Sequence, residues 1–192
     1  MGHRPMPEHE SRRFLTKLGL TSALAITGAL AALAPSAFAC QGARLSASSL
    51  TVDQARGAVT CLVNRKRAHN HVRPVHPSAP LATAAQVHTD AMTVENFFSH
   101  EGDGNPASRA ANAGYTAGAR AWGVGEDLFW GAQERSTPRA TVNAWMHSPE
   151  HRGVLLSKSF RQVGIGVDQG SPAGPDNTDT GTYTALFGFR KG

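Results

Sequence analysis

Histidines and cysteines are the residues of this sequence with the widest chemical repertoire. The chain has nine histidines and two cysteines among 192 residues. It contains no H-E-x-x-H motif and no G-x-S-x-G motif, the patterns that hold a zinc ion beside its general base or present a reactive serine. His69, His71 and His76 form a His-rich turn, which either binds a metal ion or ends a helix in solvent. The sequence lacks hydrolytic machinery of a recognised type, and it favours a protein that is not an enzyme without excluding one.

The first 39 residues have the pattern of a cleaved export signal. Basic residues stand at 12, 13 and 17, an uncharged stretch runs from 18 to 34, and Ala37-Phe38-Ala39 supplies the small residues that a signal peptidase reads. We expect cleavage before Cys40, which leaves no membrane span and predicts a secreted, extracellular protein. Residues 11–15 also resemble a twin-arginine signal, so ordinary and twin-arginine export both remain open.

Cys40 and Cys61 both follow the export signal. An even number of cysteines in an oxidising compartment favours a disulfide, here closing a loop of about 20 residues that contributes roughly 3 kcal/mol in the chain-entropy description. The bridge would tie residues 40–52 to the first helix. Two free thiols, or a lipid on Cys40, are the alternatives.

The charge of the chain excludes one class of partner. Four of the 19 basic residues and two of the 14 acidic residues lie in the export signal, so 15 basic and 12 acidic residues remain, with a net charge of +3. That charge is mild, and no basic stripe with interleaved aromatic residues accompanies it. We therefore expect no nucleic-acid partner.

Hydrophobic periodicity divides the rest of the chain into helices followed by strands. The spacing predicts helices over 53–69, 79–98, 106–113 and from Thr137-Pro138, and Ser148-Pro149 begins another helix with Ser as its N-cap. Residues 118–131 are interpreted as a loop, and alternation predicts strands over 162–167 and 183–189. Gly164 and Gly166 indicate close approach by another backbone. Helices first and antiparallel strands late predict an α+β fold.

Several short motifs resemble, in order, those of bacterial CAP domains. They are Asn64-Arg65-Lys66-Arg67-Ala68, Asn96-Phe97-Phe98-Ser99-His100, Val124-Gly125-Glu126-Asp127, Trp145-Met146-His147-Ser148-Pro149-Glu150-His151-Arg152 and Val163-Gly164-Ile165-Gly166. This superfamily includes cysteine-rich secretory proteins, venom antigen 5 and plant pathogenesis-related proteins. The resemblance implies a CAP (SCP-like) domain over 53–192, a three-layer α-β-α sandwich with a small, mainly antiparallel sheet between helices, and an extracellular location.

The resemblance also implies a site. Eukaryotic relatives often have a cleft lined by two histidines and two glutamates, and His100 and Glu126 match the first of each. Ser148 and Thr182 stand where the other two are expected. Bacterial members share Ser-Pro-x-His with this chain, so His151 is the candidate for the second imidazole.

The chemistry of these three side chains leaves several functions open. Two neutral imidazoles, His100 and His151, with the Glu126 carboxylate could hold Zn²⁺ with water in the open position, or pair for acid/base work. Purely structural roles are equally open. We predict a monomeric binding module whose cleft holds a divalent metal or a small apolar ligand. Its partner would be lipid-like, a peptide or an envelope component; the alternative is a metal-assisted, protease-like hydrolase with Glu126 as base.

Overall fold

The computed structural model describes residues 40–174 and 178–192, and the described residues belong to one compact unit. The predicted export signal lies outside them. The helices of the described part are α1 (Val52–His69), α2 (Ala79–Val94), α3 (Pro106–Asn112), α4 (Pro138–His147) and α5 (Pro149–Leu155), with single 3₁₀ turns at Ala47–Ser49 and Gln133–Ser136. Its strands are β1 (His76–Pro77), β2 (Ala121–Ala132), β3 (Gln162–Asp168) and β4 (Thr180–Lys191).

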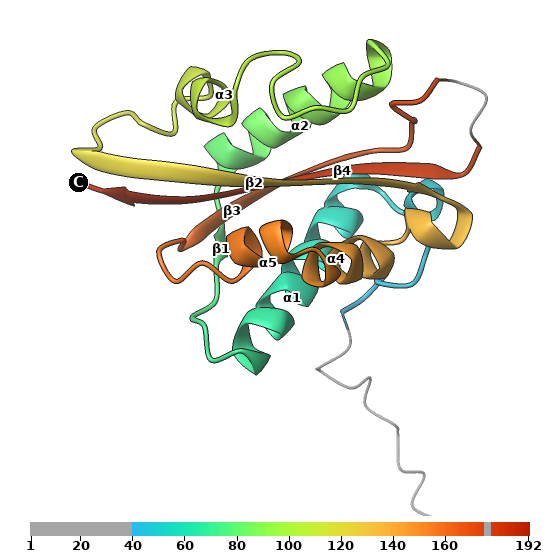
Figure 1. Cartoon of the computed structure of the whole chain (residues 1–192), viewed down its shortest axis with the longest axis horizontal. Helices are drawn as coiled ribbons and strands as arrows, with labels where there is room; N and C mark the ends of the chain where they lie inside the picture. The colour runs from blue at the N-terminus through green and yellow to red at the C-terminus, as the bar shows by residue number, and fades with distance from the viewer. Residues whose placement is uncertain (1–39, 175–177) are drawn as a thin grey trace, which may run out of the picture. The chain divides into compact units, whose positions relative to one another are not determined.

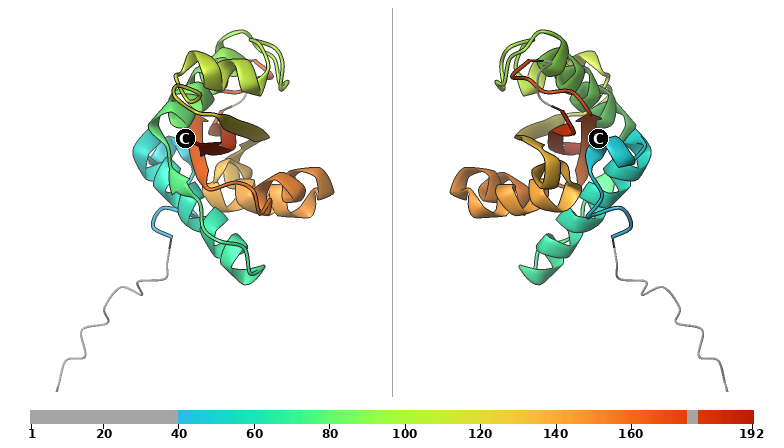
Figure 2. Two further views of the ribbon diagram at one scale, coloured as in Figure 1. Left: turned by 90° about the vertical axis from the view of Figure 1, so that its left-hand side faces the viewer. Right: turned by 90° about the vertical axis from the view of Figure 1, so that its right-hand side faces the viewer.

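These elements form three layers. The sheet has the strand order β1-β3-β4-β2, with β1 parallel to β3 and the other pairs antiparallel. Helices α2 and α3 cover one face and α1, α4 and α5 cover the other (Figure 1), as both side views also show (Figure 2). The predicted α+β, α-β-α sandwich with a mainly antiparallel sheet is confirmed. None of the described helices is long and apolar enough to cross a membrane.

Helix α1 begins where its local sequence directs. The Thr51 hydroxyl accepts from the Gln54 backbone N–H at 3.2 Å, and the Gln54 side chain accepts from the Thr51 N–H at 2.9 Å, which completes a capping box. The helix ends at His69 with Asn70 as its C-cap, and His71 follows at φ 56°. The predicted disulfide is present: Cys40 and Cys61 are bonded, with 5.6 Å between their Cα atoms. It anchors the segment before α1 to the helix.

Two glycines of β3 allow α2 to lie directly on the sheet. A Cβ atom on Gly164 would lie 2.0 Å from the Leu81 carbonyl carbon, and one on Gly166 would lie 2.2 Å from the Ala85 carbonyl oxygen. Real Cβ atoms do not approach backbone so closely, so only glycine fits either position. The predicted backbone approach is confirmed, and it fixes the height of α2 above the sheet.

The structure corrects two sequence-based boundaries. Residues 118–131, interpreted as a loop, contribute most of β2, which pairs with β4 from Ala121 to Ala132. The glycines that suggest a loop instead make room for aromatic rings, since a Cβ on Gly125 would lie 2.9 Å from Phe160. Helix α2 ends at Val94, four residues early, because Asn96 takes the left-handed conformation at φ 55°.

Candidate functional site

Glu126 is the centre of a buried polar cluster on the α2/α3 side of the sheet. Its side chain is only 1% exposed. Arg109 Nη2 donates to both carboxylate oxygens, at 2.9 and 2.8 Å, and His100 Nδ1 lies 2.9 Å from Oε1. A buried carboxylate is stable only when paired and hydrogen-bonded, and these contacts meet both conditions.

His100 connects this cluster to the surface. It lies in the connection between α2 and α3, and its side chain is 48% exposed. An ionised carboxylate only accepts hydrogen bonds, so Nδ1 carries the proton that is donated to Glu126. In the neutral ring Nε2 is then an acceptor. The loop therefore presents an oriented imidazole with one nitrogen available to a ligand.

Arg109 holds the loop around His100 in place. It stands on α3, whose start is fixed by the Asn105 cap and Pro106, and its side chain is 5% exposed. Besides Glu126, its guanidinium donates to Asp103 Oδ1 at 2.8 Å, to the His100 carbonyl at 3.1 Å and to the Gly104 carbonyl. This one cation links α3, β2 and the 100–104 loop.

His88 is a second histidine in the cluster, and sequence analysis gave it no site role. It is fully buried on α2, and its Nδ1 lies 2.6 Å from Asp103 Oδ1. Its Nε2 lies 3.8 Å from Glu126 Oε1 and has no hydrogen-bond partner within residues 40–174 and 178–192. Burial lowers the pKa of His88, opposed most strongly by the negative charge of Glu126. A histidine within the apolar face of the 79–98 helix was the signal that could have identified it.

His151 lies near this cluster without joining it. It stands in the first turn of α5 and is half-buried. Burial and then the charge of His100 lower the pKa of His151, and Glu150 opposes both. Across the described ranges, no hydrogen bond or ion pair joins it to Glu126 or His100. The structure thus brings His100 and Glu126 into contact and leaves His151 as a neighbour.

Asp127 is a buried acid on the opposite face of β2. It is 0% exposed, and neither carboxylate oxygen has a hydrogen-bond partner among the described residues. Burial, and secondarily the neighbouring charge of Glu126, raises the pKa of Asp127 to about 8. Asp127 is therefore protonated at neutral pH, and its side chain packs as a neutral group.

The donor set around Glu126 does not fit a divalent metal as it is arranged. Among residues 40–174 and 178–192, no group of three or more His, Cys, Asp or Glu side chains is placed to hold one. Both Glu126 oxygens already accept hydrogen bonds from Arg109, whose positive charge also opposes a second cation. What the arrangement provides is a carboxylate-oriented imidazole.

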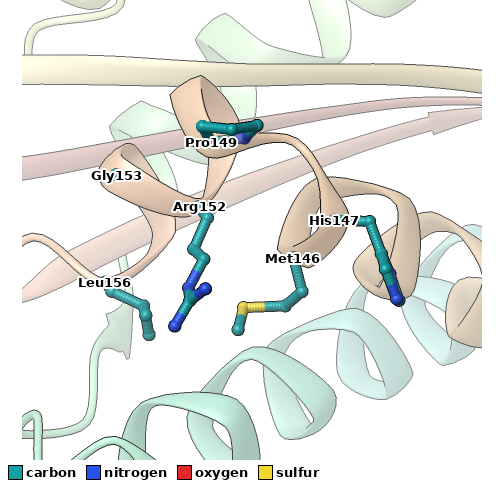
Figure 3. Close-up of a pocket in the computed structure, with 6 residues that line it drawn as sticks. All are labelled: Met146, His147, Pro149, Arg152, Gly153 and Leu156. Atoms are coloured by element: carbon teal, nitrogen blue, oxygen red, sulfur yellow. The ribbon is translucent and has the colours of Figure 1, made fainter.

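A separate surface pocket lies on α4 and α5, on the side away from the sheet. It has a volume of about 510 Å³ and is lined by Met146, His147, Pro149, Arg152, Gly153 and Leu156. The side chains of Met146, Arg152 and Leu156 extend toward α1 (Figure 3). None of the three predicted site residues lines this pocket.

Comparison with known proteins finds a family model and a related protein that each match part of this chain. The model of the cysteine-rich secretory protein family (CAP) matches residues 61–180. The uncharacterized protein YkwD of Bacillus subtilis (strain 168) is 28% identical over 113 residues, which are 57% of this chain and 41% of that protein. The chain thus spans about two fifths of this relative's length.

Two solved structures resemble the fold. An extracellular protein containing a SCP domain from Bacillus anthracis aligns with a TM-score of 0.55 and 25% identity, over 74% of this chain and 44% of that one. An outer surface protein from Borrelia burgdorferi aligns with a TM-score of 0.56 and 19% identity, over 69% and 90%. Since the family model covers most of the sandwich, including β2 and the connection that carries His100, this chain belongs to the cysteine-rich secretory protein (CAP) family.

Proposed function

We propose that this protein is an exported binding module whose ligand contacts the exposed imidazole of His100. The observation that carries the proposal is the Arg109–Glu126–His100 chain of charge-assisted hydrogen bonds. It fixes the ring and its tautomer and leaves Nε2 as an acceptor for an N–H or O–H of the ligand. Preorganisation of this kind lowers the entropic cost of binding.

Binding is favoured over catalysis because both oxygens of the Glu126 carboxylate already accept hydrogen bonds from Arg109. Glu126 is ion-paired to Arg109 through both oxygens, so a role as general base would require that pair to open. Trp122 and Val124 lie on the same face of β2 as Glu126, and Trp122 is 36% exposed. They would supply apolar surface next to the polar contact.

The test uses the chain from Cys40 onward, labelled for NMR. Three probes are added separately: a pool of random decapeptides, a sixteen-carbon fatty acid and Zn²⁺. We expect an organic probe to shift the resonances of the 98–104 loop and to lose at least about fivefold in affinity in His100→Ala. His76→Ala, on β1 at the other end of the sheet, is the matched control and should bind normally. Equal binding by both variants would refute the proposal.

Metal-assisted hydrolysis with His100, His151 and Glu126 is the second candidate. It is supported by the proximity of the two imidazoles, since His100 contributes to the lowered pKa of His151. It also requires Glu126 to leave Arg109. Calorimetric titration with Zn²⁺ should then give saturable heat that is lost in both His100→Ala and His151→Ala. Absence of heat above buffer controls removes this candidate.

Export itself is part of the proposal. The disulfide between Cys40 and Cys61 suits an oxidising compartment, and the two similar structures are described as extracellular and outer-surface proteins. We expect the protein recovered outside the cell to begin at Cys40. Mass spectrometry of its N-terminal peptide tests this, and a retained leader or a lipid on Cys40 would contradict it.

A further inference from the structure

Strand β2 forms one edge of the sheet, and among the described strands only β4 lies beside it. It pairs with β4 along its whole length, and the strand order ends with β2. On its outer side, Trp145 Nε1 donates to the Leu128 carbonyl at 3.0 Å. The Leu128 backbone groups therefore point away from β4, and the two-residue period of a strand points those of Trp122, Val124 and Glu126 the same way.

The first half of this outer edge is open. Within the described residues, no hydrogen bond reaches the outward backbone groups of Trp122 or Val124. The segment 121–125 reads Ala-Trp-Gly-Val-Gly and is exposed or half-exposed. Proteins usually protect such edges with charge, proline or a bulge, and none of these is present in 121–125. The open edge ends at Glu126, whose side chain is hydrogen-bonded to His100.

We propose that an extended peptide binds along residues 122–126 of β2 as a fifth strand. This inference rests on the proposed function, because it names the ligand that reaches His100. The outward N–H and C=O groups recur every second residue, a repeat that a β-strand of another chain matches and that a fatty acid does not. The part of the added strand beside Glu126 would lie against the His100 imidazole.

The surroundings of the edge define the peptide's side chains. On the α2/α3 face the added strand would pass Trp122 and then His100. On the other face it would pass the half-buried Val154 and Phe160, which lie within about 3 Å of where a Gly125 Cβ would be. An alternating peptide with apolar side chains toward Val154 and Phe160 fits this edge best.

The experiment begins by selecting decapeptides from a displayed random library on the chain from Cys40 onward. With a saturating selected peptide, we expect the Trp122 and Val124 amides to exchange with deuterium at least about tenfold more slowly. The Gly123 and Gly125 amides, which already bond to β4, should be unchanged. This period-two pattern needs no variant that might unfold.

A second measurement tests the same geometry from the peptide side. N-methylation at alternate residues in one register should weaken binding at least about tenfold, because it removes the N–H groups that face β2, and the other register should be tolerated. Trp122→Ala should weaken binding, whereas Val87→Ala, an exposed apolar side chain on α2, should not.

The possible failures are distinguishable. Peptides that bind without the period-two pattern, or equal sensitivity in both registers, would overturn the edge proposal while leaving the binding function intact. Selection that enriches no peptide would also overturn it, and the fatty-acid and Zn²⁺ probes would still test the function. A period-two pattern with unchanged affinity in His100→Ala would support the edge and refute the role of His100.

Discussion

Replacing Asp127 with asparagine should stabilise this protein in a strongly pH-dependent way. Asp127 is fully buried, and neither of its oxygens has a hydrogen-bond partner in the part of the chain that the structure describes; burial raises its pKa from 3.8 to about 8. In the unfolded chain the carboxyl ionises near its ordinary pKa, so the folded state binds one proton more between these values. Folding stability must therefore fall as the pH rises through this window.

The size of this difference in stability follows from the pKa shift of Asp127. One pKa unit corresponds to about 1.4 kcal/mol, so holding Asp127 protonated at pH 7 costs as much as about 4 kcal/mol relative to a neutral side chain of the same shape. Below about pH 4 both states are protonated and the cost disappears. Above about pH 8 it is constant. The introduced asparagine does not titrate, so the Asp127→Asn variant should gain stability over the wild type only as the pH increases.

Urea unfolding of wild type and Asp127→Asn at pH 4, 5.5, 7 and 8.5 measures this directly. The difference in the free energy of unfolding should be near zero at pH 4 and largest at pH 8.5. Asp53→Asn is the control, because the Asp53 side chain is 91% exposed, and its effect should stay small throughout. A difference for Asp127→Asn that does not grow with pH would refute the reasoning, since it would mean that Asp127 is ionised in the folded state.

Three further perturbations test the polar cluster, the packing of α2 and the disulfide. Arg109→Met removes the guanidinium from the buried Glu126 carboxylate and from the partly buried Asp103 and should cost about 3–5 kcal/mol in urea unfolding; a loss below about 1 kcal/mol would show that the ion pairs are dispensable. Gly164→Ala forces a Cβ into the α2 backbone and should lower stability by about 2 kcal/mol or more, whereas Gly57→Ala, with open space around it, should raise it by about 0.5–1 kcal/mol. Equal effects of the two alanines would contradict the close approach. Reducing the Cys40–Cys61 bond should cost about 2–4 kcal/mol, and thiol labelling without reductant should find no free cysteine.

Structural features that depend on neighbouring residues could be predicted from the sequence. The Ser148-Pro149 start of α5 depends only on neighbouring residues, and the glycines of β3 act through the absence of a side chain, so sequence spacing is enough to identify them. Residues 118–131 were misassigned because their glycines and acidic residues have weak strand propensity and interrupt the aromatic and aliphatic residues that favour a strand. Their conformation depends on pairing with β4, about sixty residues later in the chain, and β-propensity is decided largely by such neighbours.

The candidate site likewise contains residues that could be predicted from the sequence and residues that could not. Family motifs pointed to His100 and Glu126, and the two are in contact across 26 residues of sequence. Arg109 was missed because it stands in an alanine-rich helix with nothing local to mark its role. Its ion pair with Glu126 exists only because α3 is folded over the face of β2 on which even-numbered side chains lie.

The sequence by itself determined the five helices and the last two strands, the cysteine pair, the small-residue contact of β3 and the resemblance to the family. These properties depend on residue type and short spacing, which every chain displays before it folds. Only the tertiary structure decided that Glu126 binds Arg109, that His88 joins the cluster, that His151 stays outside it and that β2 has an open edge. Each of these outcomes depends on which groups become buried next to one another. That is decided only when segments far apart in the sequence pack together.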